Sequence, residues 1–300
     1  DQGRWATNPF QLTDKGHRFY GLGTADMKSF LALAIEAARD VRAGDLQQPL
    51  IILATADEES SMNGAEELVM LGRPKARYAI VGEPTGMRPI RAHKGIMMEA
   101  IHLQGQSGHS SDPALGNSAL EGMQAVMTEI LQWRTMLQAQ HRNPAFAIPY
   151  PTLNLGHIHG GDNPNRICGD CELHIDLRPL PGMPLEELRQ ELAQRVERVA
   201  AQRQLSARVT SLFKGTEAME TPADAELVKY AEAMTGHAAE TVAFCTEGPY
   251  LQQLGMQTII LGPGNIDQAH QPDEYIEQAS LQPTVAFLKN AIRHYCVKPQ

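Results

Sequence analysis

The sequence has few cysteines and no long apolar run, and each shortage excludes a class of protein. Four cysteines in 300 residues are too few for the disulfide framework of a small secreted domain. The longest apolar runs, such as Leu50–Ala54, fall far short of the roughly 20 residues that a membrane-spanning helix requires. No secretory signal opens the chain, so we expect reduced thiols, no membrane span and a cytoplasmic location.

Basic residues are also in the minority. The chain has 26 Lys and Arg against 35 Asp and Glu, a formal net charge of -9 at pH 7, and no Lys/Arg cluster interrupts this balance. A partner with a phosphate backbone is therefore disfavoured, and we expect no nucleic-acid partner. With 42% hydrophobic residues, the chain is long enough for one large or two ordinary domains, each with a buried core.

The first part of the chain alternates helical and strand patterns. From Met27 to Val41 the apolar residues recur at helical spacing, which predicts a helix with one buried stripe. Leu50–Ala54 and Tyr78–Val81 are short continuous apolar runs, which predict strands buried on both faces of a parallel sheet. This alternation is typical of an α/β fold.

The pattern then changes to that of an α+β unit. In Met97–Leu103 and Cys171–Leu177 apolar residues alternate with other types, which predicts half-exposed antiparallel strands. Helical patterns cover Ala119–Leu137 and continue from Pro184, and Arg208–Phe213 predicts a closing strand. The order strand, helix, strand, strand, helix, strand predicts an α+β sandwich inserted into the α/β domain.

The α/β pattern resumes toward the end of the chain. Thr241–Phe244 and Gln257–Leu261 predict further strands, and Pro283–Tyr295 predicts a terminal helix. The expected domains are a first part of the α/β domain at residues 1–89, the inserted domain at 90–213 and a second part of the α/β domain at 214–300.

Acidic residues gather where predicted strands end or a helix begins. Asp26 precedes the first helix. Glu58 and Glu59 follow one strand, and Glu83 follows another. Since ligands of an α/β sheet bind at the carboxyl ends of its strands, we expect these carboxylates to converge. They would repel one another unless a cation neutralised them, and together with His270 they suit zinc, cobalt or manganese. The alternative for any one of them is a solvated surface charge.

Five segments resemble, in the same order along the chain, the motifs of the M20 family of metallopeptidases. They are Gly21–Lys28, Ala54–Glu59, Val81–Thr85, Gly105–Ser110 and Ala269–Glu274. The resemblance implies an α/β, zinc-exopeptidase-like catalytic domain with an inserted α+β domain, a ferredoxin-like sandwich that serves as lid and dimerisation domain. Ala92–Gly95, Pro151–Gly161 and Cys245–Glu247 resemble most closely the members that remove the acyl group from a small N-acyl amino acid, so a substrate of that class is implied.

The resemblance also implies a role for each converging residue. Asp26 would bridge two divalent metal ions, zinc or cobalt, and Glu83 would bind one of them. Glu59 and His270 would bind the other ion. Glu58 would be the general base, because a water shared by two metals loses its proton near neutral pH and a neighbouring carboxylate can pass that proton to the leaving amine.

Residues of the inserted domain are implied to complete the site. His109 matches a histidine that the family supplies from the partner subunit to hold the developing oxyanion, so a homodimer is implied. The alternative is a loop histidine that caps a helix near Pro113. Asn165 and Arg178 resemble positions that grip a substrate carboxylate, for which a guanidinium is well shaped. Arg178 also fits an ordinary exposed strand position.

Four further residues have weaker signals. Gly264, in the turn Gly262–Asn265, is predicted to line the floor of the pocket through its backbone, although a plain turn fits equally well. Glu247 is a candidate partner for a substrate ammonium, on charge complementarity alone. His157 and His159 alternate at the end of a strand, and we interpret them as packing and loop residues rather than ligands.

One motif of the family is absent from the sequence. A His followed two residues later by Asp would lie upstream of the segment that begins at residue 1. We therefore expect one of the two metal sites to lack its His ligand in this chain, and the chain alone to be unstable or weakly active, with an unpaired sheet edge. The alternative is a longer protein whose upstream segment lies outside this sequence.

Two other functions are compatible with these residues. The metal ligands do not encode the acyl group, so one alternative is a sister amidohydrolase that removes a succinyl group or cleaves a dipeptide. The other is a metal-poor paralogue that binds without catalysis. Glu58 argues against that second alternative, because a pure binding protein has no use for a general base.

Overall fold

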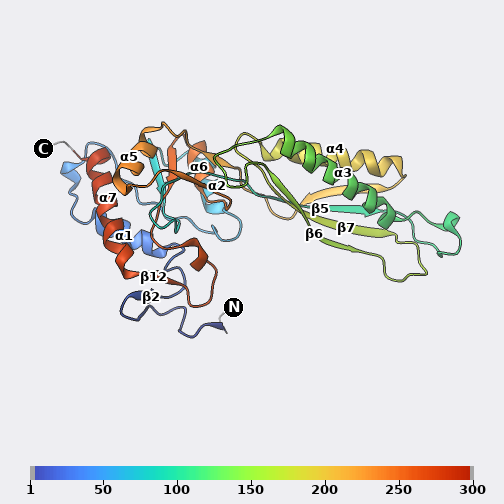
Figure 1. Ribbon diagram of the computed structural model, residues 1–300, viewed down its shortest axis with the longest axis horizontal. Helices are drawn as coiled ribbons and strands as arrows, with labels where there is room; N and C mark the ends of the chain where they lie inside the picture. The colour runs from blue at the N-terminus through green and yellow to red at the C-terminus, as the bar shows by residue number, and fades with distance from the viewer. Residues whose placement is uncertain (1–3, 298–300) are drawn as a thin grey trace. The chain divides into compact units, whose positions relative to one another are not determined.

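The computed structural model describes residues 4–297 and divides the chain into two compact units. Unit 1 is formed by the residues up to Ala92, by Glu220–Glu240 and by the residues from Thr246 onward. Unit 2 is formed by His93–Met219 and Thr241–Cys245. Each unit has its own helices and strands (Figure 1). Each also has its own buried side chains. Among the described residues, no helix is both long enough and apolar enough to cross a membrane.

Unit 1 contains a mixed sheet, a small antiparallel sheet and the helices around them. The elements that lie wholly or partly in it are β1 (Thr13–Asp14), β2 (Arg18–Tyr20), α1 (Lys28–Ala38), η2 (Ala43–Asp45), α2 (Asn63–Leu71), β3 (Tyr78–Val81), β4 (Ile90–His93), β9 (Met219–Glu220), α5 (Glu226–Thr235), β10 (Glu240–Val242), α6 (Gly248–Gln253), β11 (Gln257–Ile260), η4 (Ile266–Gln268), β12 (Tyr275–Glu277), η5 (Gln278–Ser280) and α7 (Leu281–Cys296).

The mixed sheet brings two strand ends to one edge. Its strand order is β10-β4-β11-β3, with β9 paired to β4, while β1, β2 and β12 form the small sheet. β3 and β11 are parallel, with Tyr78 opposite Gln257 and Val81 opposite Ile260. Their carboxyl ends therefore meet at the same edge, and Glu83 follows β3 at that edge.

One apolar core fixes α1, α5 and α7 against this sheet. Phe30 of α1, Leu227 of α5 and Phe287 of α7 belong to one cluster of buried side chains that also contains Ile259 of β11. The Phe30 ring lies against the backbone of Gly82, where an added Cβ would come within 2.1 Å of the ring. The close approach at this glycine holds α1, and the loop before it, beside the end of β3.

One predicted strand is not observed, and the boundaries of another are shifted. Leu50–Ala54 forms no strand among the described residues, and the side chains of Ile51 and Ile52 are 44% and 42% exposed. An apolar run becomes a strand only where a neighbouring backbone satisfies its N–H and C=O groups, and no described strand pairs with this segment. The strand predicted at Thr241–Phe244 is observed at Glu240–Val242.

Unit 2 has the order strand, helix, strand, strand, helix, strand that the sequence predicted. Its elements are β5 (Met97–Gln104), η3 (Pro113–Leu115), α3 (Ala119–Gln140), β6 (Thr152–Gly160), β7 (Asp170–Arg178), α4 (Leu185–Gln202) and β8 (Ser206–Ser211). The sheet is antiparallel throughout, in the order β6-β7-β5-β8. α3 and α4 pack on each other and cover one face of it (Figure 1).

Alternation along β7 separates the two faces of this sheet. Leu173, Ile175 and Leu177 are buried beneath the helices. The intervening residues, which include Glu172 and His174, are only partly buried and point to the opposite face. We call this opposite side, which α3 and α4 do not cover, the open face of unit 2.

His93, at the end of β4, makes the stability of the protein depend on pH. Its side chain is fully buried, and Nδ1 lies 2.7 Å from the carbonyl oxygen of Lys94. Burial lowers the pKa of His93 to about 4, below the ordinary value of 6.5. Below pH 6.5 the unfolded chain therefore binds a proton that the folded chain does not bind. We expect this residue to reduce the free energy of unfolding by about 3 kcal/mol as pH falls from 6.5 to 4, with no loss above that window.

Urea unfolding between pH 4 and pH 7 tests this expectation with His93→Asn. Asn retains an N–H donor close to the position of Nδ1 but does not titrate. The stability of the wild type should therefore fall more steeply than that of the variant, by about 3 kcal/mol over the window. His237→Asn, at a partly exposed histidine after α5, is the control and should leave the slope unchanged. Parallel curves for the wild type and His93→Asn would contradict the expectation.

Candidate active site

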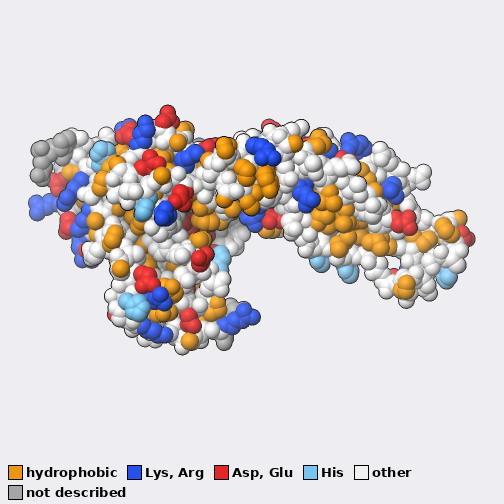
Figure 2. Space-filling view, viewed as in Figure 1, with side chains coloured by type: hydrophobic (Ala, Val, Ile, Leu, Met, Phe, Trp, Pro, Cys, Tyr) orange, Lys and Arg blue, Asp and Glu red, His pale blue; other side chains and the backbone are white. Residues whose placement is uncertain are grey.

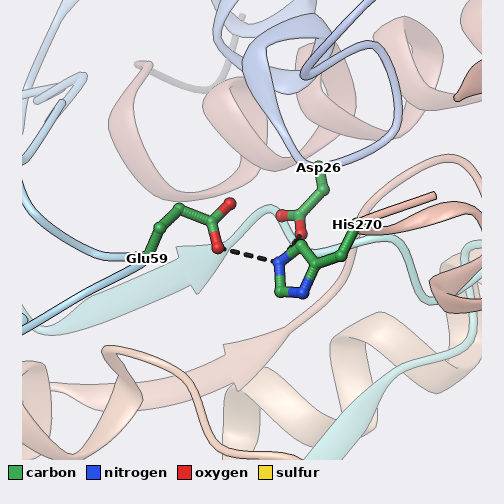
Figure 3. A group of neighbouring side chains, drawn as sticks. All are labelled: Asp26, Glu59 and His270. Carbon is green, nitrogen blue, oxygen red and sulfur yellow. Dashed lines mark hydrogen bonds and ion pairs between the residues drawn. The ribbon is translucent and has the colours of Figure 1, made fainter. Parts of the chain in front are cut away.

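Unit 1 brings together three of the predicted metal ligands. Asp26 comes from the loop before α1, Glu59 from the loop before α2, and His270 from the turn after η4 (Figure 3). Nε2 of His270 lies 2.8 Å from Oε2 of Glu59 and 3.4 Å from Oδ2 of Asp26. One ligand atom from each residue lies within 4.8 Å of the other two. We call these three residues the ligand group.

The geometry of the ligand group fits a divalent metal ion. Zinc binds nitrogen and carboxylate oxygen at about 2.0–2.2 Å, so two ligand atoms of a tetrahedral ion lie about 3.4 Å apart. The distance from His270 to Asp26 matches this spacing, and the shorter distance to Glu59 requires a small widening. Carboxylate oxygen and imidazole nitrogen are ligands that zinc and cobalt both accept.

Glu83 lies on the buried side of the ligand group. Its side chain is 6% exposed at the end of β3, and its carboxyl group shares a hydrogen bond with that of Asp26. Burial, and next the charge of Asp26, raises the pKa of Glu83 well above its ordinary value. Burial is also the main reason that the pKa of Asp26 is raised. Two adjacent carboxyl groups of this kind hold either a proton or a cation between them, so Glu83 and Asp26 also fit a divalent ion.

Glu58, the predicted general base, lies beside the ligand group. Burial raises the pKa of Glu58 to about 7, with the charge of Glu59 as the next largest cause. The charges of Glu247 and Asp26 act in the same direction, which places Glu58 close to both. A carboxyl group that titrates near neutral pH can both accept a proton and return it, as general acid–base catalysis requires.

Glu247 presents a buried carboxylate oxygen to the same region. Its Oε2 accepts a hydrogen bond of 2.8 Å from Oγ1 of Thr55. Its Oε1 is buried and has no hydrogen-bond partner among the described residues. Burial raises the pKa of Glu247, whose charge in turn raises that of Glu58. A buried carboxylate oxygen without a partner can accept a hydrogen bond, and a cationic group is a suitable donor.

Gly264 packs against the loop that holds Asp26 and the strand end that holds Glu83. Its φ of +86° lies in the left-handed region that favours glycine, and its carbonyl oxygen accepts the N–H of Gly86 at 2.7 Å. A Cβ built on Gly264 would lie 3.4 Å from the Cβ atoms of Ala25 and Pro84. These are the neighbours of Asp26 and Glu83, so the turn forms part of the wall behind both carboxylates.

Sequence reasoning missed the role of Glu274. This carboxylate is 1% exposed and accepts backbone N–H groups of the loop before α1. The donors are Gly23 at 2.7 Å, Ala25 at 2.7 Å and Asp26 at 2.9 Å. Glu274 thereby fixes the backbone that presents Asp26. Its place at the end of the segment Ala269–Glu274 was a signal, but the sequence does not indicate which distant backbone a glutamate will bind.

His109 and Asn165 lie together at one end of the unit 2 sheet. The N–H of Ser110 donates to the carbonyl oxygen of Asn165 at 2.9 Å. His109 is exposed, and its Nδ1 accepts the N–H of Ser111 at 3.2 Å, so the neutral ring has its hydrogen on Nε2 and can donate it. The alternative that His109 caps a helix is wrong, because Asp112 caps η3.

Arg178 lies at the opposite end of the same sheet. Its Nε donates to both carboxylate oxygens of Asp176, at 2.9 and 3.1 Å. The loop that contains Asn165 joins β7 at Asp170, and the 9 residues of β7 separate that end from Arg178 by about 26 Å. The structure therefore does not bring Asn165 and Arg178 of one chain together, and one small substrate cannot contact both.

Comparison with known proteins identifies the family. Residues 1–294 match the family described as peptidase family M20/M25/M40. The chain is 50% identical over 296 residues to an acetylornithine deacetylase of Edwardsiella ictaluri, covering 99% of this chain and 77% of that protein. It is 48% identical over 296 residues to an acetylornithine deacetylase of Klebsiella pneumoniae, with the same coverage of 99% and 77%.

Solved structures agree on the fold. A tripeptidase from Staphylococcus aureus superposes with a TM-score of 0.73 at 20% identity, covering 97% of this chain and 77% of that chain. An M20 family metallo-carboxypeptidase from Sulfolobus solfataricus superposes with a TM-score of 0.70 at 13% identity, covering 98% and 81%. At such low identity these two structures support the mixed α/β fold alone. Together with the sequence match over nearly the whole chain, they lead to one conclusion: the chain belongs to the peptidase family M20/M25/M40.

Proposed function

We propose that this protein hydrolyses the amide bond of N2-acetyl-L-ornithine to acetate and L-ornithine, a step of arginine biosynthesis in the cytoplasm. The relatives from Edwardsiella ictaluri and Klebsiella pneumoniae support the substrate, because both are named acetylornithine deacetylase. The observation that carries the proposal is the position of Glu58, a carboxyl group with a pKa of about 7 beside a group of metal-ligand side chains.

Two divalent metal ions, zinc or cobalt, belong to the proposed site. Glu59 and His270 would hold one ion and Glu83 the other, with Asp26 as a further ligand. When bound, the ions lower the pKa of a bound water and polarise the amide carbonyl. Glu274 keeps Asp26 in place through its three hydrogen bonds to the loop backbone.

The protein's own side chains move the protons of the reaction. Glu58 takes the proton of the water as its oxygen attacks the acetyl carbon. His109 donates the hydrogen on Nε2 to the oxygen that becomes negatively charged, an interaction worth a few kcal/mol of barrier. When the C–N bond breaks, Glu58 returns the proton to the amine nitrogen, and acetate and ornithine leave.

The positions of the unit 2 residues support a homodimer. His109 and Asn165 lie at one end of the sheet and Arg178 at the other, about 26 Å apart along β7. No single chain can direct all three at one substrate of this size. In a symmetric dimer, the His109 end of one subunit serves the site of its partner, and unit 2 acts as both lid and dimerisation domain.

Acetate release from N2-acetyl-L-ornithine, measured beside succinate release from N-succinyl-diaminopimelate with zinc or cobalt supplied, tests the proposed function. We expect preferential release of acetate. Preferential release of succinate would leave the fold and ligand group intact but replace the substrate with that of a sister amidohydrolase. Turnover of neither substrate by protein that includes any upstream segment would favour a dipeptidase or a protein that binds without catalysis.

The buried carboxylate of Glu247 indicates how the enzyme selects ornithine. We expect its unpartnered Oε1 to accept a hydrogen bond from the side-chain ammonium of the substrate. A hydrogen bond to a charged group contributes about 1.5–3 kcal/mol, so Glu247→Gln should lower kcat/KM for N2-acetyl-L-ornithine by about 10- to 100-fold. N-acetyl-L-methionine, of similar length but uncharged, is the control substrate and should lose less than about threefold. Equal losses for both substrates would show that Glu247 supports the site without selecting the cation.

A further inference from the structure

The open face of unit 2 carries histidines and carboxylates that the proposed reaction does not use. His157 of β6 lies opposite His174 of β7, and His159 lies opposite Glu172. On the other side of β7, His102 of β5 lies opposite Glu172 in the strand register. Directly opposed residues on one face of an antiparallel sheet have Cβ atoms about 4.5–5.5 Å apart. Glu172 therefore has an imidazole on each side of it.

These side chains are accessible from solvent. His157 and His159 are exposed, and the side chains of His102 and His174 are 25% and 28% exposed. Figure 2 shows histidine side chains at the surface over the strands of unit 2. The interpretation of His157 and His159 as packing residues is therefore wrong, because both side chains are exposed.

A hydrogen bond to Glu172 prepares His174 to bind a metal. Its Nε2 lies 2.6 Å from Oε1 of Glu172. An ionised carboxylate can only accept, so Nε2 of the neutral ring carries the hydrogen and Nδ1 has a free lone pair. Metal-binding histidines donate their second nitrogen to a carboxylate in the same manner, which fixes the ring and makes it a better ligand. The hydrogen bond from His174 lowers the pKa of Glu172.

The distance between two of the rings fits one metal ion. The ring centroids of His157 and His174 lie 4.8 Å apart. Two imidazoles bound to a tetrahedral zinc ion with bonds of about 2.0–2.1 Å have centroids about 5 Å apart. The separation of the two rings therefore matches that of two imidazoles that share one ion.

We propose that the open face of unit 2 binds a divalent ion of the zinc type through His157 and His174, with His159 as third ligand and water completing the coordination. His159 follows His157 by two residues and points to the same face. Among the described residues, only the ligand group of unit 1 already has potential metal-ligand atoms of three residues within 4.8 Å of one another. Rotation of the exposed His159 side chain between staggered conformations brings the third ligand to the ion.

Equilibrium dialysis against zinc alone tests this proposal on the full chain. We expect His157→Ala/His174→Ala to bind one zinc ion fewer per chain than the wild type at saturation. Glu172→Gln retains the side-chain size but loses the charge that supports His174, and should weaken binding of that ion by about 10- to 100-fold. Neither variant alters a buried side chain, and circular dichroism checks that both are folded.

His141→Ala/His237→Ala removes the same number of histidines from other parts of the chain and is the matched control. It should bind as much zinc as the wild type. Equal stoichiometry and equal affinity in the wild type and His157→Ala/His174→Ala would overturn the proposal, as would an equal loss of zinc in the control. The site shares no residue with the ligand group of unit 1, so its failure would leave the proposed deacetylation unaffected.

Discussion

Glu58→Gln should lower kcat for N2-acetyl-L-ornithine by about 10³-fold, within the range of 10² to 10⁴ that general acid–base catalysis contributes. Gln has the size of Glu but cannot take the proton of the attacking water or return it to the amine. KM should change little, because the substrate contacts remain. The bound metal should also remain, since Glu58 lies beside Asp26, Glu59 and His270 without belonging to the ligand group. Acetate release and metal content, measured on the same preparation, check both expectations.

Glu67→Gln is the matched control for this experiment. Glu67 is exposed on α2, a few residues after Glu58 in the sequence, and should tolerate the same loss of charge without effect. Unchanged kcat in Glu58→Gln would remove the general base from the mechanism and favour the non-catalytic alternative. Loss of metal together with loss of activity would instead identify Glu58 as a ligand.

Strands and helices with a clear period were predictable from the sequence. Tyr78–Val81 is observed as β3 without a change of boundary, and the alternating residues around Leu173 form β7 with the predicted faces. Leu50–Ala54 was equally apolar but forms no strand, because strand formation also requires a paired backbone, and the described residues provide none. The spacing of apolar residues indicates which side chains can be buried, whereas the pairing of strands depends on neighbours that lie far away in the sequence.

The candidate site was predictable to a similar extent. The carboxylates of Asp26 and Glu59 were expected to converge with those of Glu58 and Glu83 at one edge of a sheet, and the resemblance added His270. The structure places the ligand atoms of Asp26, Glu59 and His270 together, although the strand predicted before Glu59 does not form. The role of Glu274 was not predictable, since its partners are backbone N–H groups that have no signature in the sequence. The separation of Asn165 from Arg178 also required the structure, because it depends on the register of β7.

His109→Ala should lower kcat by about 10²–10³-fold, the cost of removing one donor to a developing oxyanion. Activity should return when this variant forms mixed dimers with Glu58→Gln. In a mixed dimer, the site of the His109→Ala subunit has an intact Glu58 and receives an intact His109 from its partner. The other site lacks both groups. When equal amounts of the two variants associate at random, about half of the dimers are mixed. Each mixed dimer has one working site of two, so about a quarter of wild-type activity should return.

The control for this experiment pairs His109→Ala with a subunit that carries both Glu58→Gln and His109→Ala, and no activity should return. If His109 served its own chain, no mixed dimer would contain a complete site, and the absence of recovery with Glu58→Gln alone would contradict the dimer. Asn165 lies at the same end of the sheet as His109. Asn165→Ala should therefore be rescued by Glu58→Gln but not by His109→Ala, because both losses then fall on the end of unit 2 that serves the partner's site.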